Sequence, residues 1–161
     1  MTKLHPSCIF FIFFVFALFG CSHAFDKEND LPIQRYDEYV GALSKKSYED
    51  ILKEYWAESF VSESLPLLLD GSENAKLERN SVIFSINFPQ DMTSMVFQKE
   101  NVNNQSACVL VAGVSEENTP LIFNVAYTME NGRWLIKKVH GAFLRASDSY
   151  PSQPDCFPAA P

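Results

Sequence analysis

The chain has 161 residues, 47% of them hydrophobic, and 20 acidic against 13 basic side chains give a formal net charge of −7 at pH 7. An acidic chain of this kind is poorly suited to nucleic acid and to electrostatic docking on anionic lipid, so we expect no nucleic-acid partner. The length suits one domain with a sizeable core.

The first feature along the chain is an apolar run near its start. Residues 8–20 are apolar throughout and follow a short segment that carries Lys3. A positive start, an apolar run and small residues after it are typical of an export signal. The run is also shorter than the roughly 20 residues that a permanent membrane-spanning helix needs. We therefore predict that residues 1–20 are a signal peptide.

The end of this segment, Leu18-Phe19-Gly20-Cys21, resembles the lipobox of bacterial lipoproteins. The resemblance implies that Cys21 becomes the N-terminus, carries lipid such as palmitate, and anchors the protein to the membrane, with residues 21–31 as a tether. Ser22 after the cysteine implies sorting to the outer membrane, facing the periplasm. The alternative is cleavage after Ala24, which gives a soluble secreted or periplasmic protein.

Two further cysteines, Cys108 and Cys156, remain in the exported chain. An even pair in an oxidising compartment predicts a disulfide, which would tie the Pro-rich tail of residues 146–161 to the sheet. The alternative is two free thiols, with Cys108 buried as a small apolar residue.

The first part of the domain is predicted to be helical. Apolar residues at spacings of three and four predict an amphipathic helix over 32–44. Ser47 and Asp50 resemble a capping box that opens a second helix, which places Tyr55 and Trp56 on one side. Apolar residues then continue to Asp70-Gly71, so two or three packed helices are expected here.

The pattern then changes to one that favours strands. Val82, Phe84, Ile86 and Phe88 alternate with other residues, which predicts a strand over 82–88. Residues 93–99 and 107–115 are read as two more strands. Residues 120–130 and 133–144 form a hairpin around Asn131-Gly132, a pair typical of a two-residue type I′ turn. The tail, in which Pro recurs, is expected to be loosely ordered.

Helices followed by strands predict one α+β domain over 32–145, with helices packed on an antiparallel sheet of four to five strands. Residues 32–142 resemble the nuclear transport factor 2-like superfamily, also called cystatin-like or ketosteroid-isomerase-like. The resemblance rests on the N-terminal helices and on the closing hairpin from Tyr127 to Ile136. It implies a curved, cone-like sheet, often with an internal pocket and often with dimerisation through the outer sheet face, so a homodimer is one expectation.

The hairpin register suggests where polar groups lie. With Asn131 and Gly132 as the turn, Met129 faces Trp134, Tyr127 faces Ile136, Val125 faces Lys138 and Phe123 faces His140, all on the face toward the helices. This predicts an apolar pocket for a small apolar or anionic ligand, or a peptide, in which the candidate binding residues are Tyr127, Lys138, His140, Trp134 and Tyr55. The alternative is that Lys138 extends to solvent and His140 is structural.

Chemistry beyond binding has little support in the sequence. A proton-transfer enzyme of the isomerase or dehydratase type would draw on His140, Tyr127 and Tyr55, but no inward carboxylate can be assigned to complete the site. The pattern contains no set of metal ligands and no nucleotide-binding loop, so no catalytic residue, metal or cofactor is predicted. A non-catalytic envelope protein is expected. Its alternative role is contact with another envelope protein, as an assembly accessory or as an inhibitor or immunity-type protein.

Overall fold

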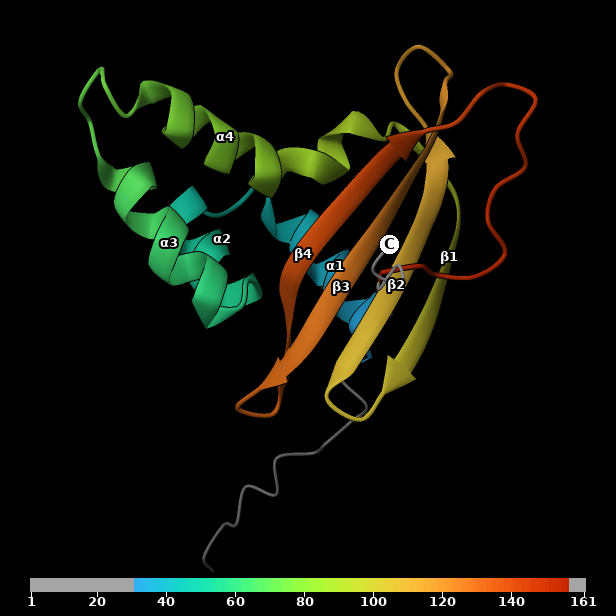
Figure 1. The fold of residues 1–161 in the computed structure, drawn as a ribbon, viewed down its shortest axis with the longest axis horizontal. Coiled ribbons are helices and arrows are strands. Elements are labelled where there is room, and N and C mark those ends of the chain that lie inside the picture. The colour runs from blue at the N-terminus through green and yellow to red at the C-terminus, as the bar shows by residue number, and fades with distance from the viewer. Residues whose placement is uncertain (1–30, 157–161) are drawn as a thin grey trace, which may run out of the picture.

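The computed structural model describes residues 31–156, and these form an α+β fold in which helices precede a curved four-stranded antiparallel sheet (Figure 1). The elements in chain order are α1 (Pro32–Ala42), α2 (Tyr48–Tyr55), α3 (Glu58–Leu69), α4 (Lys76–Asn87), the short 3-10 helix η1 (Phe88–Asp91), β1 (Ser94–Asn103), β2 (Ser106–Val114), β3 (Pro120–Glu130) and β4 (Arg133–Phe143). The predicted signal peptide, Cys21 and almost all of the tether lie outside the described residues. Among the described residues, no helix combines the length and the apolar character that crossing a bilayer requires.

The first two helices follow the predicted pattern. In α1, Tyr36 and Tyr39 are buried three residues apart against the sheet. Ser47 caps α2, because its hydroxyl accepts a hydrogen bond from the backbone N–H of Asp50 at 3.2 Å. This bond satisfies one of the free N–H groups at the start of the helix. The amphipathic spacing and the capping residue are therefore confirmed as the local causes of these elements.

The predicted strand over 82–88 is wrong, because residues 82–87 belong to α4 and Phe88 begins η1. Val82 and Ile86 are four residues apart, so the alternation that suggested a strand also fits one face of a helix, where both are buried. The Tyr39 hydroxyl donates a hydrogen bond to the backbone carbonyl of Ile86. Phe84, between them, lies on the opposite side and is 68% exposed.

The sheet is an antiparallel meander in the order β1-β2-β3-β4, which makes β1 and β4 its edge strands. The predicted turn at Asn131-Gly132 is confirmed, and both residues have positive φ, 52° and 80°, as a type I′ turn requires. The strand predicted over 93–99 is longer than expected, because β1 continues to Asn103 and turns through Asn104 and Gln105 into β2.

The hairpin register is confirmed near the turn and wrong beyond it. Met129 pairs with Trp134 and Tyr127 with Ile136, but the register then shifts by one residue, so that Lys138 pairs with Ala126 and His140 with Asn124. Lys137 is the extra residue of this β-bulge. Because side chains alternate between faces, one extra residue moves Lys138 and His140 to the outer face of the sheet.

The main core lies between the helices and the inner sheet face, where Tyr39, Ile51, Leu52, Val125 and Ile136 are fully buried. A smaller cluster lies on the outer face and is covered by the segment that follows β4; its buried members are Leu110, Ala112 and Ile122. The two apolar faces explain why β2 and β3 are buried over almost their whole length.

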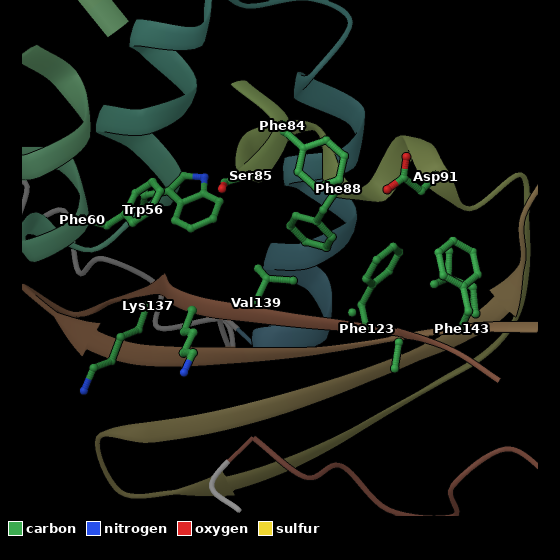
Figure 2. A pocket seen from close by; sticks show the side chains of 14 residues that line it. Trp56, Phe60, Phe84, Ser85, Phe88, Asp91, Phe123, Lys137, Val139 and Phe143 are labelled. Carbon is green, nitrogen blue, oxygen red and sulfur yellow. The ribbon is translucent and has the colours of Figure 1, made fainter. Parts of the chain in front are cut away.

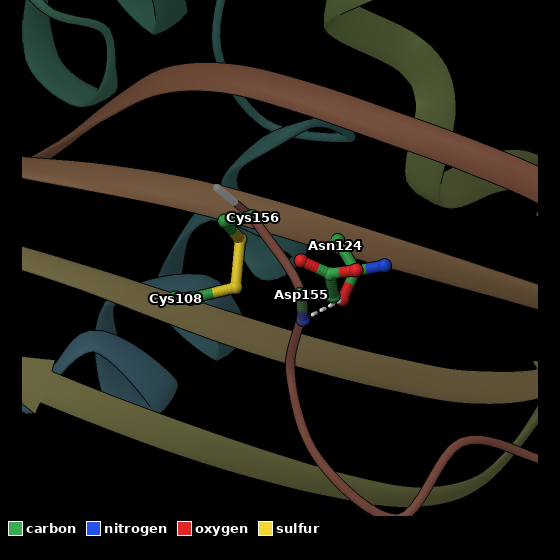
Figure 3. The surroundings of a disulfide bond; sticks show 4 residues. All are labelled: Cys108, Asn124, Asp155 and Cys156. Carbon is green, nitrogen blue, oxygen red and sulfur yellow. Dashed lines mark hydrogen bonds between the residues drawn. A yellow bond between two sulfur atoms is a disulfide. The ribbon is translucent and has the colours of Figure 1, made fainter. Parts of the chain in front are cut away.

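The tail is packed on the sheet up to Cys156, although loose order was expected. Figure 1 shows this segment in red, leaving the end of β4, looping out beyond β1 and returning over the sheet toward β2. The predicted disulfide between Cys108 and Cys156 is present, with the two Cα atoms 5.6 Å apart. Beside it, the backbone N–H of Asp155 donates to the side-chain oxygen of Asn124 at 3.0 Å (Figure 3). The disulfide and this hydrogen bond hold the Pro-containing tail against the sheet, although the tail does not pair with a strand.

Candidate functional site

An apolar groove opens between the helical layer and the last two strands. We call it the α4–β4 groove, and its volume is about 390 Å³. Its lining consists mainly of aromatic and aliphatic side chains, with a few polar groups at the margins: Trp56, Phe60, Phe84, Ser85, Phe88, Asp91, Leu121, Phe123, Lys137, Lys138, Val139, Gly141, Ala142 and Phe143. Pockets of this size and composition are typical of sites that bind small molecules or peptide side chains.

The helical side of the groove is an aromatic wall. Trp56, just after α2, stacks on Phe60 of α3, with ring centroids 4.2 Å apart. Phe88 of η1 packs edge to face on Phe123 of β3 at 4.9 Å. Figure 2 shows the rings of Trp56, Phe60, Phe84 and Phe88 on the helical side of the groove and the Phe123 ring on the sheet side. The stacked and edge-to-face pairs fix most of the wall before any ligand arrives.

The floor of the groove is the inner face of β3 and β4 near the end of the sheet. Val139, Gly141 and Phe143 lie here because the β-bulge at Lys137 brings them, rather than Lys138 and His140, to the inner face. Gly141 leaves space for the Phe123 ring, since a Cβ built on it would lie 3.1 Å from two carbons of that ring. Small size at this position therefore keeps the floor open.

Two of the groove's aromatic side chains are largely exposed: Phe84 is 68% and Phe143 is 65% accessible. Rings at a surface are common, but here they border a hollow that other aromatic side chains line. Covering a phenylalanine ring of this exposure stabilises a complex by about 1 to 2 kcal/mol. These two rings are consequently the parts of the groove that gain most from a bound partner.

Charged groups lie at opposite ends of the groove. Asp91 is near Phe88 and Phe143, whereas Lys137 is at the end nearer Trp56 and Phe60. Figure 2 shows the Lys137 side chain extending away from the aromatic wall. Ser85 is engaged within its own helix, donating to the carbonyl of Ser81 at 2.9 Å. The groove thus has an apolar centre between a negative end and a positive end.

The structure does not bring the five candidate binding residues together. Tyr127, Trp134 and Tyr55 are inward but lie in the packed core, with 1%, 4% and 4% of their surface exposed. Lys138 and His140 are exposed and lie across the sheet from them, so the prediction that they face the helices is wrong. Lys138 and His140 instead border a hollow of about 340 Å³ between the outer face and the tail.

The buried tyrosines have the electrostatics of a core rather than of a reactive site. Burial raises the pKa of Tyr127 well above its ordinary value, and its hydroxyl has no hydrogen-bond partner in the protein. Burial likewise raises the pKa of Tyr55, whose ring lies 4.3 Å from the Arg35 guanidinium carbon. Arg35 is held by Glu38 and by the Glu54 carbonyl, at 2.7 and 2.6 Å. The Arg35 contacts join α1 to α2.

Within residues 31–156, the buried polar or charged side chains are Arg35, Ser64 and Asn124, and none is a carboxylate. The same residues contain no cluster of three or more potential metal ligands. A proton-transfer site needs a base facing a donor, and the buried residues of this part of the chain include no carboxylate to act as that base.

The groove was missed in the sequence because its wall was assigned to a strand. In the sequence, Phe84 was interpreted as one residue of the apolar alternation over 82–88. On a helix, a step of two residues turns a side chain by about 200°, so Phe84 faces away from Val82 and Ile86. An aromatic residue opposite the buried face of a helix was the sequence feature that could have indicated the groove.

Comparison with known proteins adds no assignment, because no protein-family model and no curated protein matches the sequence.

Proposed function

We propose that this domain is a binding module that holds an apolar ligand with an anionic group in the α4–β4 groove. The observation that supports it is the pair of exposed rings, Phe84 and Phe143, at the border of a groove whose inner wall is already packed. Lys137 at one end favours an anionic group there. Binding does not require a catalytic constellation.

The test is a fluorescence titration with anilinonaphthalenesulfonate, an apolar anion, against the folded exported domain. We expect Phe84→Ser to weaken binding about tenfold, which corresponds to about 1.4 kcal/mol. Leu77→Ser is the matched control, because Leu77 is also on α4, is 78% exposed and does not line the groove. Equal loss in both variants, or no loss in either, contradicts the proposal.

The charge preference needs its own comparison. Lys137→Ala is expected to weaken the sulfonate dye by a few-fold, whereas a neutral dye such as Nile red should bind wild type and variant alike. The effect should shrink as salt is added, because exposed charges are screened within about 8 Å at physiological ionic strength. Loss of both dyes would indicate that the lysine stem, rather than its charge, matters.

We further propose that the domain is presented in the cell envelope by a lipid on Cys21, most directly at the outer membrane facing the periplasm. Support comes from the lipobox-like Leu18–Cys21 segment and from the Cys108–Cys156 bridge, which suits an oxidising compartment. Stable anchoring takes more than one acyl chain, as lipoprotein maturation supplies. Metabolic labelling with an alkyne analogue of palmitate should mark wild type and not Cys21→Ser. An unlabelled chain that begins at Phe25 would instead establish secretion after Ala24.

A further inference from the structure

The edge of β4 beside the groove is open along most of its length. At its beginning, the backbone N–H of Ala57 donates to the carbonyl of Ile136 at 2.9 Å, and Trp56 and Ile136 form a short parallel bridge. The chain then turns away into α3. In the described residues, this is the single backbone hydrogen bond to β4 from outside the sheet. The fold thus starts a further strand on this edge and leaves the remainder unpaired.

The orientation of the unpaired groups follows from strand alternation. Leu144, just after β4, donates its N–H to Pro120 at 2.8 Å, so residues an even number of positions before it also face β3. Val139, Gly141 and Phe143 therefore direct their N–H and C=O groups away from the sheet. Ile136 does the same on the other side of the bulge, because the extra residue Lys137 shifts the alternation by one.

The same three residues line the α4–β4 groove. A row of free backbone donors and acceptors, about 15 Å long on strand spacing, thus borders an apolar hollow. A small apolar ligand would leave these donors and acceptors to water. An extended peptide would use both, because its backbone pairs with the edge while its alternate side chains enter the hollow.

The positions of the charges select the direction of such a peptide. β4 runs from Lys137 and Lys138 toward Phe143 and Asp91. A peptide antiparallel to it begins near Asp91 and ends near the lysines. Its amino end, or a basic residue there, meets the carboxylate, and its carboxyl end, or an acidic residue there, meets the Lys137 ammonium group.

A second copy of this chain fits the edge less well. In Figure 1, α3 and α4 reach past β4 on the side of its free edge. Antiparallel pairing of two β4 edges would place both helical layers on the same side of the joined sheet and bring these projecting helices into the same space. A single extended peptide has no helical layer, so it can pair with the edge without this overlap.

Resting on the proposed binding function of the groove, we propose that the natural ligand is an extended peptide that adds antiparallel to β4 at Val139, Gly141 and Phe143. Its alternate apolar side chains lie under Phe84, and an acidic residue or carboxyl terminus lies by Lys137. The peptide class is therefore basic at its start, alternating apolar and polar in its middle, and acidic at its end.

The experiment titrates isotope-labelled exported domain with the synthetic peptide Arg-Val-Thr-Phe-Thr-Val-Glu, followed by nuclear magnetic resonance. We expect shifts at the three edge residues and at least tenfold slower amide exchange there, because each N–H gains an acceptor. A peptide of the same composition with its apolar residues contiguous is the first control. Methylation of the backbone nitrogens that face the edge should abolish protection, while methylation of the intervening ones should not.

The matched protein variants are Val139→Pro and Val102→Pro. Val139→Pro removes an outward N–H without breaking a bond to β3, and proline is tolerated at such edge positions. Val102 is one pair away from the two-residue β1–β2 turn, so its N–H also points outward, but on the opposite edge. We expect at least tenfold weaker peptide binding in Val139→Pro and no change in Val102→Pro. The methylated peptides decide the question even if Val139→Pro is unfolded.

Each result separates this inference from the function on which it rests. If the dye binds and the peptide gives no edge protection, the strand-addition proposal is overturned and the groove remains a small-molecule site. If neither binds, both proposals fail. Protection that rises with protein concentration in the absence of peptide, together with a dimer in sedimentation, would show that a second copy occupies the edge and would also overturn the proposal.

Discussion

The disulfide between Cys108 and Cys156 should carry a large part of the domain's stability. It closes a loop of 48 residues, and the loop-closure relation for that length gives about 4 kcal/mol at ordinary temperature. The bridge also holds Asp155 against Asn124 and brings Tyr150 within 2.6 Å of the Gly113 carbonyl. Removing it frees the tail in the unfolded state and weakens these contacts in the folded one.

The perturbation is the double variant Cys108→Ala, Cys156→Ser, which avoids leaving a hydroxyl at the buried position 108. With a urea dependence of about 2 kcal/mol per molar, a loss of about 4 kcal/mol lowers the unfolding midpoint by about 2 M. The melting temperature should fall by roughly 13 °C. Unfolding is followed by circular dichroism and by tryptophan fluorescence, since Trp56 and Trp134 are both buried.

Asp155→Ala is the control for this experiment. The contact of Asp155 with Asn124 uses its backbone N–H, so removing the carboxylate should change stability by less than about 1 kcal/mol. Reduction of the wild type by dithiothreitol should reproduce most of the double variant's loss. The reasoning is refuted if oxidised wild type and the double variant unfold at the same urea concentration.

Two further predictions concern the buried tyrosines and a close approach in the sheet. Burial raises the pKa of Tyr36, Tyr39 and Tyr127 above the value of 10.0 that an unfolded chain retains. Above pH 10 the unfolded state therefore binds fewer protons than the folded state, so the free energy of unfolding should fall by about 1 kcal/mol per pH unit for each tyrosine. Urea titrations measure this free energy, and tyrosinate absorbance follows the ionisation. An unchanged free energy of unfolding up to pH 12 would contradict the prediction. Gly113→Ala should destabilise the domain by more than about 2 kcal/mol, because its new Cβ overlaps a backbone carbonyl of β1. In contrast, a Cβ at Gly41 in α1 meets nothing within 4 Å, so Gly41→Ala should stabilise the domain slightly. Equal melting temperatures of these two variants would show that the sheet yields at Gly113.

Much of the fold followed from local patterns. Ser47 and Asp50 predicted the start of α2, and Asn131-Gly132 predicted the β3–β4 turn, because capping and type I′ geometry depend on a few adjacent residues. The order of helices before strands predicted the α+β class. The pairing of Cys108 with Cys156 followed from their number and from the expected compartment.

The candidate site depended on two features that adjacent residues do not encode. One is the bulge at Lys137, which moved Lys138 and His140 to the outer face, since a register is chosen by packing along the whole strand. The other is the assignment of Val82 to Asn87, where an alternation of period two also places Val82 and Ile86 on one helical face. As a helix the segment buries Val82 and Ile86 and contacts the Tyr39 hydroxyl through the Ile86 carbonyl.

The sequence by itself determined the class of fold, the turn of the last hairpin and the cysteines available for a bridge, because each depends on composition or on a short run of residues. Only the tertiary structure decided which side chains line the groove and which edge of the sheet is open. The lining of the groove and the open edge depend on one extra residue in β4 and on the position of α4. Packing between segments that are distant in the chain determines both.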